Sequence, residues 1–363
     1  MLFRTPEDHA IDRELRELDE LRARLGDSTG AAGPWLGTLR RQVRAASAAS
    51  SIAIEGFRVP QAETVALATG ARQPDLDDDD RMALACYGRA MDHVGTLAVD
   101  PRFRWLDRVI LDLHFDTCWF QREARPGLYR EGGIAVTSLT GAGHAYVGPP
   151  AEDVPALMDE LVAWLEEGDL DAHVVVRAAM AHLHLVSIHP FGDGNGRISR
   201  ILQSLVLARE RRVAPEFGSI EEHLRQHTGA YYATLQEVQG GSYRPERDAM
   251  AWVRFCVRAH LAQARARLTQ IEHASARWSH LEELVEARGW PDRLVIALEQ
   301  TLFGAADRAA YAQEAGVSPA TASADFRRLV DAGLVVQHGM GRATRYLATD
   351  ALRDGVGRAL RDR

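Results

Sequence analysis

The sequence predicts a mainly α-helical protein with a small β-hairpin and a separate C-terminal domain, and three observations support this. Apolar residues recur at helical spacing over most of the chain, as in the series Ile11, Leu15, Leu18 and Leu21. Short β-like segments are confined to residues 133–147 and 334–347. A Gly-Trp-Pro stop at residues 289–291 marks the best domain boundary in the 363 residues.

The periodic pattern can be divided into individual elements. A Gly- and Pro-containing break is expected at 26–34, and the acidic run at 77–80 fits a solvated helix entry better than a calcium loop. The segments 133–137 and 145–147 predict a hairpin with a glycine-rich tip at 140–144. We predict helices over residues 8–25, 35–54, 81–98, 103–120, 152–167, 172–187, 196–211, 219–239, 246–270, 275–288, 293–303, 307–315 and 320–332.

Composition excludes several classes of protein. The net charge of −8 argues against nonspecific nucleic-acid binding by the whole chain. The three cysteines are far apart and odd in number, which fits reduced thiols rather than a disulfide framework or a zinc site. No secretory signal and no apolar run of about 18 residues is visible. We therefore expect a cytoplasmic protein that does not enter a membrane.

The chain contains no lysine, so every fixed side-chain cation is an arginine. This excludes a P-loop and a protein-kinase site, which both place a lysine on the phosphates. It also excludes chemistry through a lysine Schiff base. Any nucleotide must be held by arginines, backbone N–H groups and a metal ion.

One stretch concentrates residues suited to phosphate chemistry. Pro190 ends the preceding helix, and the glycines at 192, 194 and 196 allow positive φ and a close approach of backbone to an anion. A new helix begins at about residue 196, where its N-terminus adds partial positive charge. Arg197 and Arg200 share one face of its first turn. Asp193 is best explained as a ligand for phosphate-bound Mg²⁺. The stretch reads His189, Pro190, Phe191, Gly192, Asp193, Gly194, Asn195, Gly196, Arg197, Ile198, Ser199 and Arg200.

These twelve residues resemble the signature of the Fic family, H-P-F-x-[D/E]-G-N-G-R-x-x-R, at every position. The resemblance implies a Fic-type helical core that transfers AMP from ATP to a Ser, Thr or Tyr hydroxyl of a target protein, or of itself. It implies that His189 is the general base and that Asp193 holds Mg²⁺. It assigns the rest of the nucleotide-binding loop to Gly194, Asn195, Gly196, Arg197, Ile198, Ser199 and Arg200, with the two arginines on the outer phosphates.

A second motif lies upstream, at the end of the helix predicted over 35–54. Ser51 and Glu55 are four residues apart on one helix face, and Gly56 is placed to end the helix. This resembles the inhibitory motif of Fic proteins, [S/T]-x-x-x-E-[G/N]. We expect Glu55 to pair bidentately with Arg200, which would displace the outer phosphates and keep basal activity low. We also expect a homodimer.

The resemblance assigns roles to two further regions. The hairpin within 130–148 corresponds to a flap that pairs with an extended segment of the target protein, and Ile134, Ala135 and Val136 are its best candidates for nucleotide contact. Tyr231, Tyr232 and Gln239 correspond to residues that line the adenine and ribose pocket. The lone histidines His114, His182 and His184 lie among apolar residues and are expected to be structural.

Residues 292–348 resemble a winged helix-turn-helix domain. Ser318 and Pro319 are a typical helix start, and the helix after them would enter a DNA major groove. Thr321 and Ser323 would lie near the bases, and Arg327 and Arg328 nearer the phosphates. Residues 292–363 hold ten arginines and nine acidic residues, which is weakly basic for a DNA reader. Dimerisation or substrate recruitment by this domain therefore stays open.

The expected organisation has four parts. They are an N-terminal helical region over 1–104 that carries the inhibitory motif, a Fic core over 105–270, a linker helix over 271–291, and the winged-helix domain with a C-terminal tail over 292–363. Three alternatives to AMP transfer stay open. The protein could remove AMP, transfer another phosphate-containing group, or regulate transcription with its Fic core as a nucleotide sensor.

Overall fold

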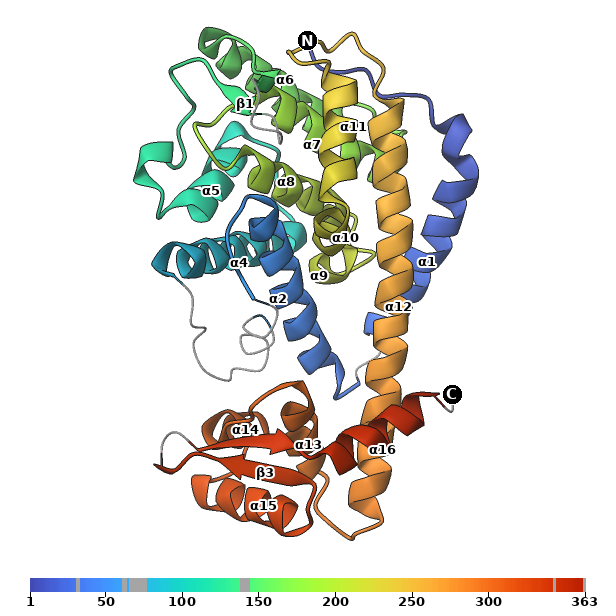
Figure 1. Cartoon of the computed structure of the whole chain (residues 1–363). Helices are drawn as coiled ribbons and strands as arrows, with labels where there is room; N and C mark the ends of the chain where they lie inside the picture. The colour runs from blue at the N-terminus through green and yellow to red at the C-terminus, as the bar shows by residue number, and fades with distance from the viewer. Residues whose placement is uncertain (31–32, 61–63, 65–76, 138–143, 342–343, 362–363) are drawn as a thin grey trace. The chain divides into compact units, whose positions relative to one another are not determined.

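The structure is a computed structural model that describes all residues except 31–32, 61–63, 65–76, 138–143, 342–343 and 362–363 (Figure 1). The chain divides into two compact units. The first unit comprises residues 1–30, 47–58 and 76–267, and the second comprises residues 31–46, 268–363 and the described part of 59–75. No helix among the described residues is long and apolar enough to cross a membrane.

The first unit is helical except for one hairpin. Its described elements are η1 (Asp8–Ile11), α1 (Asp12–Gly30), the second part of α2 (Leu36–Ile54), α4 (Asp78–Val99), α5 (Asp107–Cys118), η2 (Arg122–Ala124), β1 (Ala135–Thr137), β2 (His144–Val147), η3 (Ala151–Asp153), α6 (Val154–Glu167), α7 (Val174–Ile188), α8 (Asn195–Arg209), α9 (Pro215–Gly218), α10 (Glu221–Gln226), α11 (Thr228–Gln239) and the first part of α12 (Met250–Glu286).

Helices α7 and α8 form the centre of this unit, packed against each other, with α6 on α7 and α4 and α5 on α8 (Figure 1). Both are buried on almost all sides, so their sequences show little amphipathic periodicity. Each apolar side chain of α7 from Val175 to Ile188 is at most 7% exposed. The short turn between them therefore starts and ends on two deeply buried helices.

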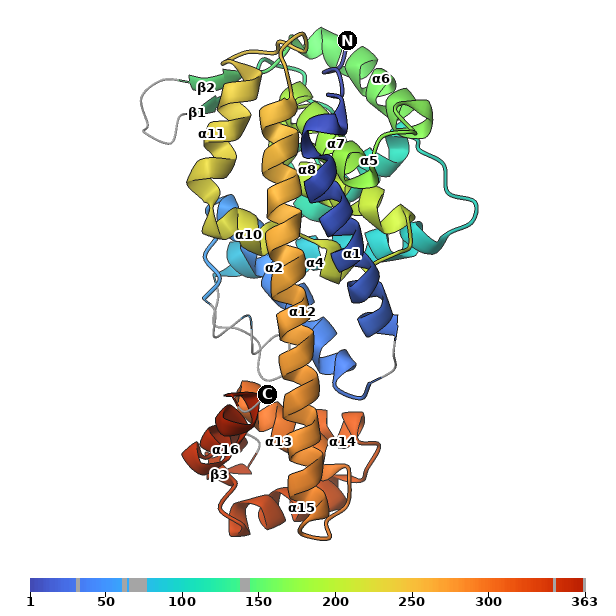
Figure 2. The same ribbon diagram turned by 90° about the vertical axis from the view of Figure 1, so that its right-hand side faces the viewer.

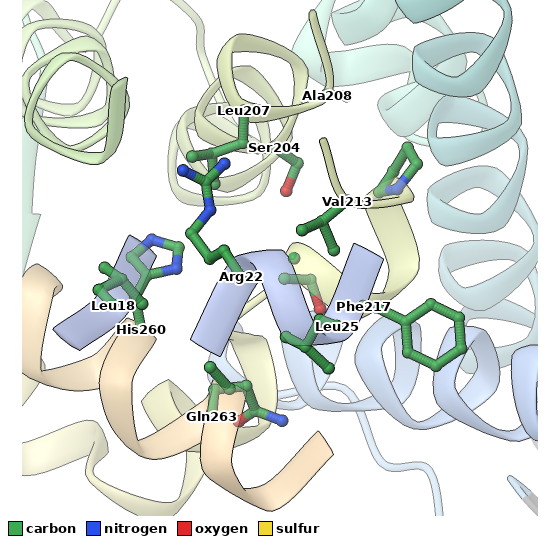
Figure 3. A pocket seen from close by; sticks show the side chains of 14 residues that line it. Leu18, Arg22, Leu25, Ser204, Leu207, Ala208, Val213, Phe217, His260 and Gln263 are labelled. Carbon is green, nitrogen blue, oxygen red and sulfur yellow. The ribbon is translucent and has the colours of Figure 1, made fainter. Parts of the chain in front are cut away.

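Helix α1 covers one side of this core next to the first part of α12 (Figure 2). Its residues Leu18, Arg22 and Leu25 face α8 and α12 across a cavity of about 20 Å³ (Figure 3). Such a cavity holds about one water molecule. Arg22 is 6% exposed, and its guanidinium donates to the carboxylate of Glu210. Helix α1 thus completes the packing of the core and leaves no room there for a larger ligand.

The hairpin β1–β2 is antiparallel, with Ala135 opposite Val147 and Val136 opposite Tyr146. The outer edge of β2 is already occupied, because the Val147 N–H donates to the Gly241 carbonyl at 3.0 Å. The tip that we predicted at 140–144 lies outside the described residues, apart from His144. Among the described residues, β1 pairs with β2 alone, so its other edge has no strand beside it.

The second unit contains α13 (Leu294–Phe303), α14 (Arg308–Glu314), α15 (Pro319–Asp331), β3 (Val335–His338), β4 (Arg345–Ala348) and α16 (Asp350–Arg361), with residues 36–46 of α2 and 268–286 of α12. β3 and β4 are antiparallel. The core of this unit includes Leu298, Tyr311 and Phe326. Asp325 ties α15 to the start of α13 and to α14, because it accepts from Arg293 at 2.8 and 3.0 Å and from the Tyr311 hydroxyl at 2.8 Å.

Several expectations about elements were wrong. Helix α1 continues to Gly30, where a break was expected from residue 26. The helices predicted over 246–270 and 275–288 are one helix, α12, because no Gly or Pro interrupts residues 250–286. The segment 219–239 divides into α10 and α11 at His227, and α16 was not predicted. The compact units also cross the expected domain boundaries, since residues 31–46 group with the C-terminal unit and the division falls inside α12.

Candidate active site

A cavity of about 550 Å³ opens beside the turn between α7 and α8, within the usual size range of small-molecule sites. Residues from the turn, the hairpin, α11 and the end of α2 line it. Those that belong to the predicted site are Glu55, Ile134, Ala135, Val136, His189, Asp193, Asn195, Gly196, Tyr231, Tyr232 and Gln239. The fold thus brings together segments up to 184 residues apart, from Glu55 to Gln239.

His189 ends α7 in the left-handed conformation, with φ 51° and ψ 57°, and its N–H donates to the Leu185 carbonyl at 2.9 Å. A non-glycine residue in this region stores strain, which is common at functional sites. The imidazole Nδ1 lies 2.9 Å from the Val186 carbonyl and must donate to it. Nε2 is therefore left as a proton acceptor, and burial lowers the pKa of His189.

The turn is closed by its own side chains and backbone. The Asn195 amide accepts from the Phe191 N–H and donates to the Phe191 carbonyl, both at 2.9 Å. Gly194 has φ 82°, and a Cβ there would lie 2.4 Å from the Cys118 sulfur. Of the three glycines of the turn, Gly194 is the one with positive φ, which corrects the expectation for Gly192 and Gly196.

Gly196 is needed for a different reason from Gly194. It lies in the first turn of α8, and a Cβ there would lie 2.4 Å from Glu55 Oε1 and 3.3 Å from Arg200 Nη1. The first N–H groups of a helix have no acceptor within the helix, so those of Asn195, Gly196 and Arg197 are free to bind an anion. The carboxylate oxygen of Glu55 therefore stands beside the place where the helix favours a phosphate.

Asp193 lies next to Gln121 and Arg197. Its Oδ1 accepts from the Gly194 N–H at 2.7 Å, and its Oδ2 accepts from Gln121 Nε2 at 2.6 Å and from Arg197 Nη2 at 3.1 Å. The same Arg197 nitrogen donates to Gln121 Oε1 at 2.8 Å. The guanidinium of Arg197 also lies over the ring of Phe57, 5.4 Å from its centre. Gln121 and Phe57 thus hold the inner arginine, and neither residue belongs to the motifs seen in the sequence.

Arg200 is 2% exposed and contacts the end of α2. Its Nη2 donates to Glu55 Oε1 at 2.7 Å and to the Ser51 carbonyl at 3.0 Å, and its Nε donates to the Ser51 hydroxyl at 2.8 Å. The pairing with Glu55 is confirmed, but it uses one carboxylate oxygen rather than two, and Ser51 accepts from the Nε and Nη2 edge of the guanidinium.

Gly56 ends α2 as expected. Its φ is 93°, and the N–H groups of Gly56 and Phe57 donate to the carbonyls of Ala53 and Ile52, at 3.2 and 3.3 Å. This pair of bonds is a Schellman motif. It fixes where Glu55 leaves the helix.

Two residues outside the signature support the turn. His114 stacks on Phe191 with ring centres 3.7 Å apart, accepts from the Gly127 N–H, and donates to the Asp193 carbonyl at 3.1 Å. Burial lowers its pKa to about 4, so this ring stays neutral. Arg130 donates to the carbonyls of His189, Gly132 and Pro149 at 2.6–2.8 Å, and so joins the base of the hairpin to the turn. No motif in the sequence predicted this role of Arg130.

The remaining predicted residues fall into two groups. Ile134, Ala135, Val136, Tyr231, Tyr232 and Gln239 line the cavity. Ile198 and Ser199 do not line it, since both are 0% exposed and the Ser199 hydroxyl donates to the Asn195 carbonyl at 2.8 Å within the helix. His182 and His184 are fully buried, and burial lowers the pKa of each to about 3.

The residues present fit a magnesium ion that arrives with a nucleotide. Asp193 is half exposed at the cavity, with side-chain exposure of 50%. No group of three or more His, Cys, Asp or Glu side chains among the described residues could enclose a metal by itself. Mg²⁺ is commonly held by one or two carboxylates plus phosphates and water. Buried nitrogens of Arg197 and Arg200 that lack a partner offer further charge to an anion.

Comparison with known proteins agrees with this geometry. Residues 105–207 match the Fic/DOC family. The chain contains a Fic domain.

Full-length relatives extend the likeness beyond that domain. The chain is 30% identical over 197 residues to a protein from Aedes aegypti named protein adenylyltransferase Fic, which covers 54% of this chain and 37% of the relative. A relative of the same name from Drosophila mojavensis is 30% identical over 242 residues, covering 64% of this chain and 44% of the relative. The chain spans less than half the length of these curated relatives.

Solved structures share the fold. A Fic family protein from Desulfovibrio desulfuricans aligns over 96% of this chain and 98% of its own, with a TM-score of 0.60 and 21% identity. Fic-1 from C. elegans, residues 134–508, aligns over 72% of this chain and 73% of its own, with a TM-score of 0.58 and 23% identity. At this identity the likeness concerns the fold of the Fic domain and its surroundings.

Proposed function

We propose that the protein transfers AMP from ATP to a hydroxyl group of a target protein. The observation that carries this proposal is the orientation of His189. Its Nδ1–H is bound to Val186, so Nε2 remains a neutral acceptor in the cavity next to the anion-binding end of α8. The relatives named protein adenylyltransferase support the choice of group transferred.

In this mechanism the target hydroxyl donates its proton to His189 Nε2 while its oxygen attacks the α-phosphate of ATP. The bond to the β-phosphate breaks, and pyrophosphate leaves. N–H groups at the start of α8 stabilise the charge on the α-phosphate. Arg197 and Arg200 hold the outer phosphates and stabilise the leaving pyrophosphate. Asn195 contributes by shaping the turn, since both ends of its side-chain amide bond to the Phe191 backbone.

Asp193 is the residue that would hold Mg²⁺, and the ion would neutralise phosphate charge when bound. For that, Asp193 Oδ2 has to exchange its contacts with Gln121 and Arg197 for the metal. Arg197 would then be free to turn toward the phosphates. Binding of nucleotide and rearrangement of this trio are therefore expected to occur together.

We propose that Glu55 inhibits the transfer. Its carboxylate takes one donor of Arg200 and places negative charge within contact distance of the first turn of α8. An ATP molecule bound beside it would lose a cation for its outer phosphates and meet a like charge. The same carboxylate could instead orient a water molecule for AMP removal, a reaction distinguished by measuring release of AMP from modified protein.

Two variants test these roles in one assay. His189→Ala should abolish labelling of proteins from α-labelled ATP and leave nucleotide binding within about twofold, because it removes only the proton acceptor. Glu55→Gly should raise labelling at least about tenfold, because it returns the Arg200 donor to the phosphates and removes the like charge beside them, and a tenfold change requires only about 1.4 kcal/mol. Labelling that persists without His189 would exclude the mechanism. Use of UTP or another donor in place of ATP would identify a different transferred group.

The free edge of β1 is the proposed docking site for the target. An extended segment of the target would pair with residues 135–137, which places its hydroxyl next to His189 across the cavity. Ala135 lies opposite Val147, whose N–H points away from β1 to the Gly241 carbonyl, so the Ala135 N–H points to the free edge. Ala135→Pro removes this main-chain donor and should reduce transfer to the target, with little effect on ATP binding. If transfer and ATP binding fell equally, the substitution would have damaged the nucleotide site instead of the docking edge.

A second candidate function concerns the C-terminal unit. We propose that residues 292–348 are a winged helix-turn-helix that binds DNA. Helix α15 buries Ala322, Phe326 and Leu329 and exposes Arg327 and Arg328, which suits a recognition helix. Thr321 and Ser323 are half-buried near its start. Binding of the full-length chain to a selected duplex, lost in Arg327→Ala and Arg328→Ala, tests this. We also propose a homodimer, which light scattering would detect.

A further inference from the structure

The end of α2 that carries Glu55 has a longer polar stripe than the motif shows. Ser47 precedes Ser51 by four residues, as Ser51 precedes Glu55, so the three side chains lie on one face of the helix. Ser47 is 6% exposed and Ser51 is fully buried. Ser51 and Glu55 contact Arg200, whereas Ser47 contacts a different group one turn further back.

That group is the carboxyl group of Glu221, the first residue of α10. It is 1% exposed. Its Oε2 accepts from the Ser47 hydroxyl at 3.0 Å, and its Oε1 accepts from the Tyr87 hydroxyl at 2.9 Å. The Ser47 oxygen also lies 2.6 Å from the Ser219 hydroxyl. In the described part of the chain, no arginine lies within ion-pair distance of Glu221, so these two hydroxyls are its direct donors.

A buried carboxyl group depends strongly on its donors, because leaving its oxygens unsatisfied costs the full loss of hydration. If the end of α2 moved away from the core, Glu221 would lose Ser47 and keep Tyr87 alone. Movement of α2 would therefore leave a buried oxygen of Glu221 without its donor, which costs free energy in addition to the loss of the contacts at Arg200.

The contact of Glu55 itself is modest by comparison. It uses one carboxylate oxygen, and the Glu55 side chain is 21% exposed. Partly hydrated ion pairs of this kind contribute less than fully buried hydrogen bonds to a charged group. The position of Glu55 is thus set mainly by what holds the helix behind it. The polar part of that attachment is made by Ser51 with Arg200 and by Ser47 with Glu221.

We propose that Glu221 is a positioning residue for inhibition, which holds α2 through the Ser47 hydroxyl so that Glu55 reaches Arg200. The proposal rests on the inhibition by Glu55 proposed above. It enlarges the inhibitory element from the pair Ser51 and Glu55 to a three-point attachment, in which Ser47 lies about two helical turns before Glu55.

The test measures the initial rate of protein labelling from α-labelled ATP for Ser47→Ala and Glu221→Gln. Each variant is made alone and together with Glu55→Gly. We expect each to raise the rate about tenfold when Glu55 is present, and to leave it unchanged within about twofold when Glu55 is absent. Glu221→Gln preserves the size of the side chain and guards against a failure of Ser47→Ala to fold.

Ser50→Ala is the matched control, because Ser50 is a serine of the same helix with the same exposure as Ser47, 6%. It should leave the rate unchanged in both backgrounds. A purely structural role for Glu221 would lower the rate of the Glu55→Gly protein as well. That outcome, or an unchanged rate in Ser47→Ala and Glu221→Gln while Glu55→Gly alone is activated, would overturn the proposal. No activation by Glu55→Gly itself would instead remove the inhibition on which the proposal rests.

Discussion

At the scale of single residues, the site depends on backbone conformations that few residues tolerate. His189 and Gly194 both have positive φ, at 51° and 82°, on either side of the buried Phe191. These two residues turn the chain from α7 into α8 within a few residues. They also point the imidazole into the cavity while the turn itself stays anchored in the core.

Gly194 gives a prediction about the stability of the turn. Alanine at this position would adopt an unfavourable φ and bring its Cβ to 2.4 Å from the Cys118 sulfur. Gly194→Ala should lower the free energy of unfolding by about 1–3 kcal/mol, measured by chemical denaturation. The double variant Gly194→Ala, Cys118→Ala should recover part of this loss, because it removes the clash but not the strain. No recovery would show that the close approach to Cys118 has no energetic effect.

His189 gives a prediction about pH. Burial lowers the pKa of this histidine below its ordinary value of 6.5. Because a general base must be neutral, the transfer rate is lost only as pH falls through the lowered pKa. The acid limb of the transfer rate of the Glu55→Gly protein should therefore lie below pH 6.5. An acid limb at or above 6.5, measured with saturating ATP, would contradict the assigned role or environment.

At the scale of elements, buried polar groups decide how helices attach to one another. Ser51 and Ser47 hold the end of α2 on the first unit, and Asp325 holds α15 within the second. None of these contacts follows from helical periodicity, which predicts the apolar side of a helix but not which polar partners it meets.

Glu299 on α13 gives a prediction about the second unit. It is 1% exposed, and burial raises its pKa from 4.5 to about 7, with Arg277 opposing the shift. A raised carboxyl pKa means that the fold favours the neutral form. Its contribution to stability is fully present below pH 4.5 and is lost as pH rises through about 7.

We therefore expect the melting temperature to rise when pH is lowered from about 8 to about 6. Glu299→Gln should remove most of this dependence, because glutamine stays neutral at both pH values. Glu283→Gln, a change at an exposed residue of the same unit, serves as the control and should preserve it. If the melting temperature of Glu299→Gln depends on pH as strongly as before, other titratable groups cause the dependence.

At the scale of the whole molecule, α2 and α12 each contribute residues to both compact units. Residues 36–46 of α2 have their partners in the second unit. Arg41 donates to Glu314 at 2.9 Å, and Trp35 packs against that unit's apolar core. Residues 47–54 have theirs in the first unit, at Glu221 and Arg200.

This division predicts the effect of a truncation. A chain that ends after Arg267 lacks the partners of residues 36–46 but keeps those of residues 47–54. Amide hydrogen exchange should become faster in residues 36–46, while residues 47–54 stay protected and Glu55 continues to inhibit. Loss of protection along the whole helix would show that the attachment at Ser47 and Ser51 does not hold the helix by itself.

The helical class, most helix positions and the candidate site's turn could be predicted from the sequence alone. Helical periodicity is local, and the twelve-residue stretch carries its chemistry at fixed spacing. The pairing of Glu55 with Arg200 was also predictable, although its single-oxygen geometry was not. The continuation of α1 to Gly30 and the unbroken α12 were missed, because weak local signals were overridden by packing.

The residues that hold the site in place become visible only in the folded chain. Gln121, Arg130 and His114 reach the turn from segments far away in the sequence, and Ser47 meets Glu221 across 174 residues. Such contacts depend on how helices pack, and a buried polar side chain looks the same in the sequence whether its partner is nearby or distant. The residues proposed to carry out the reaction thus lie within one short stretch of sequence. The contacts that position and control these residues form only when the chain folds.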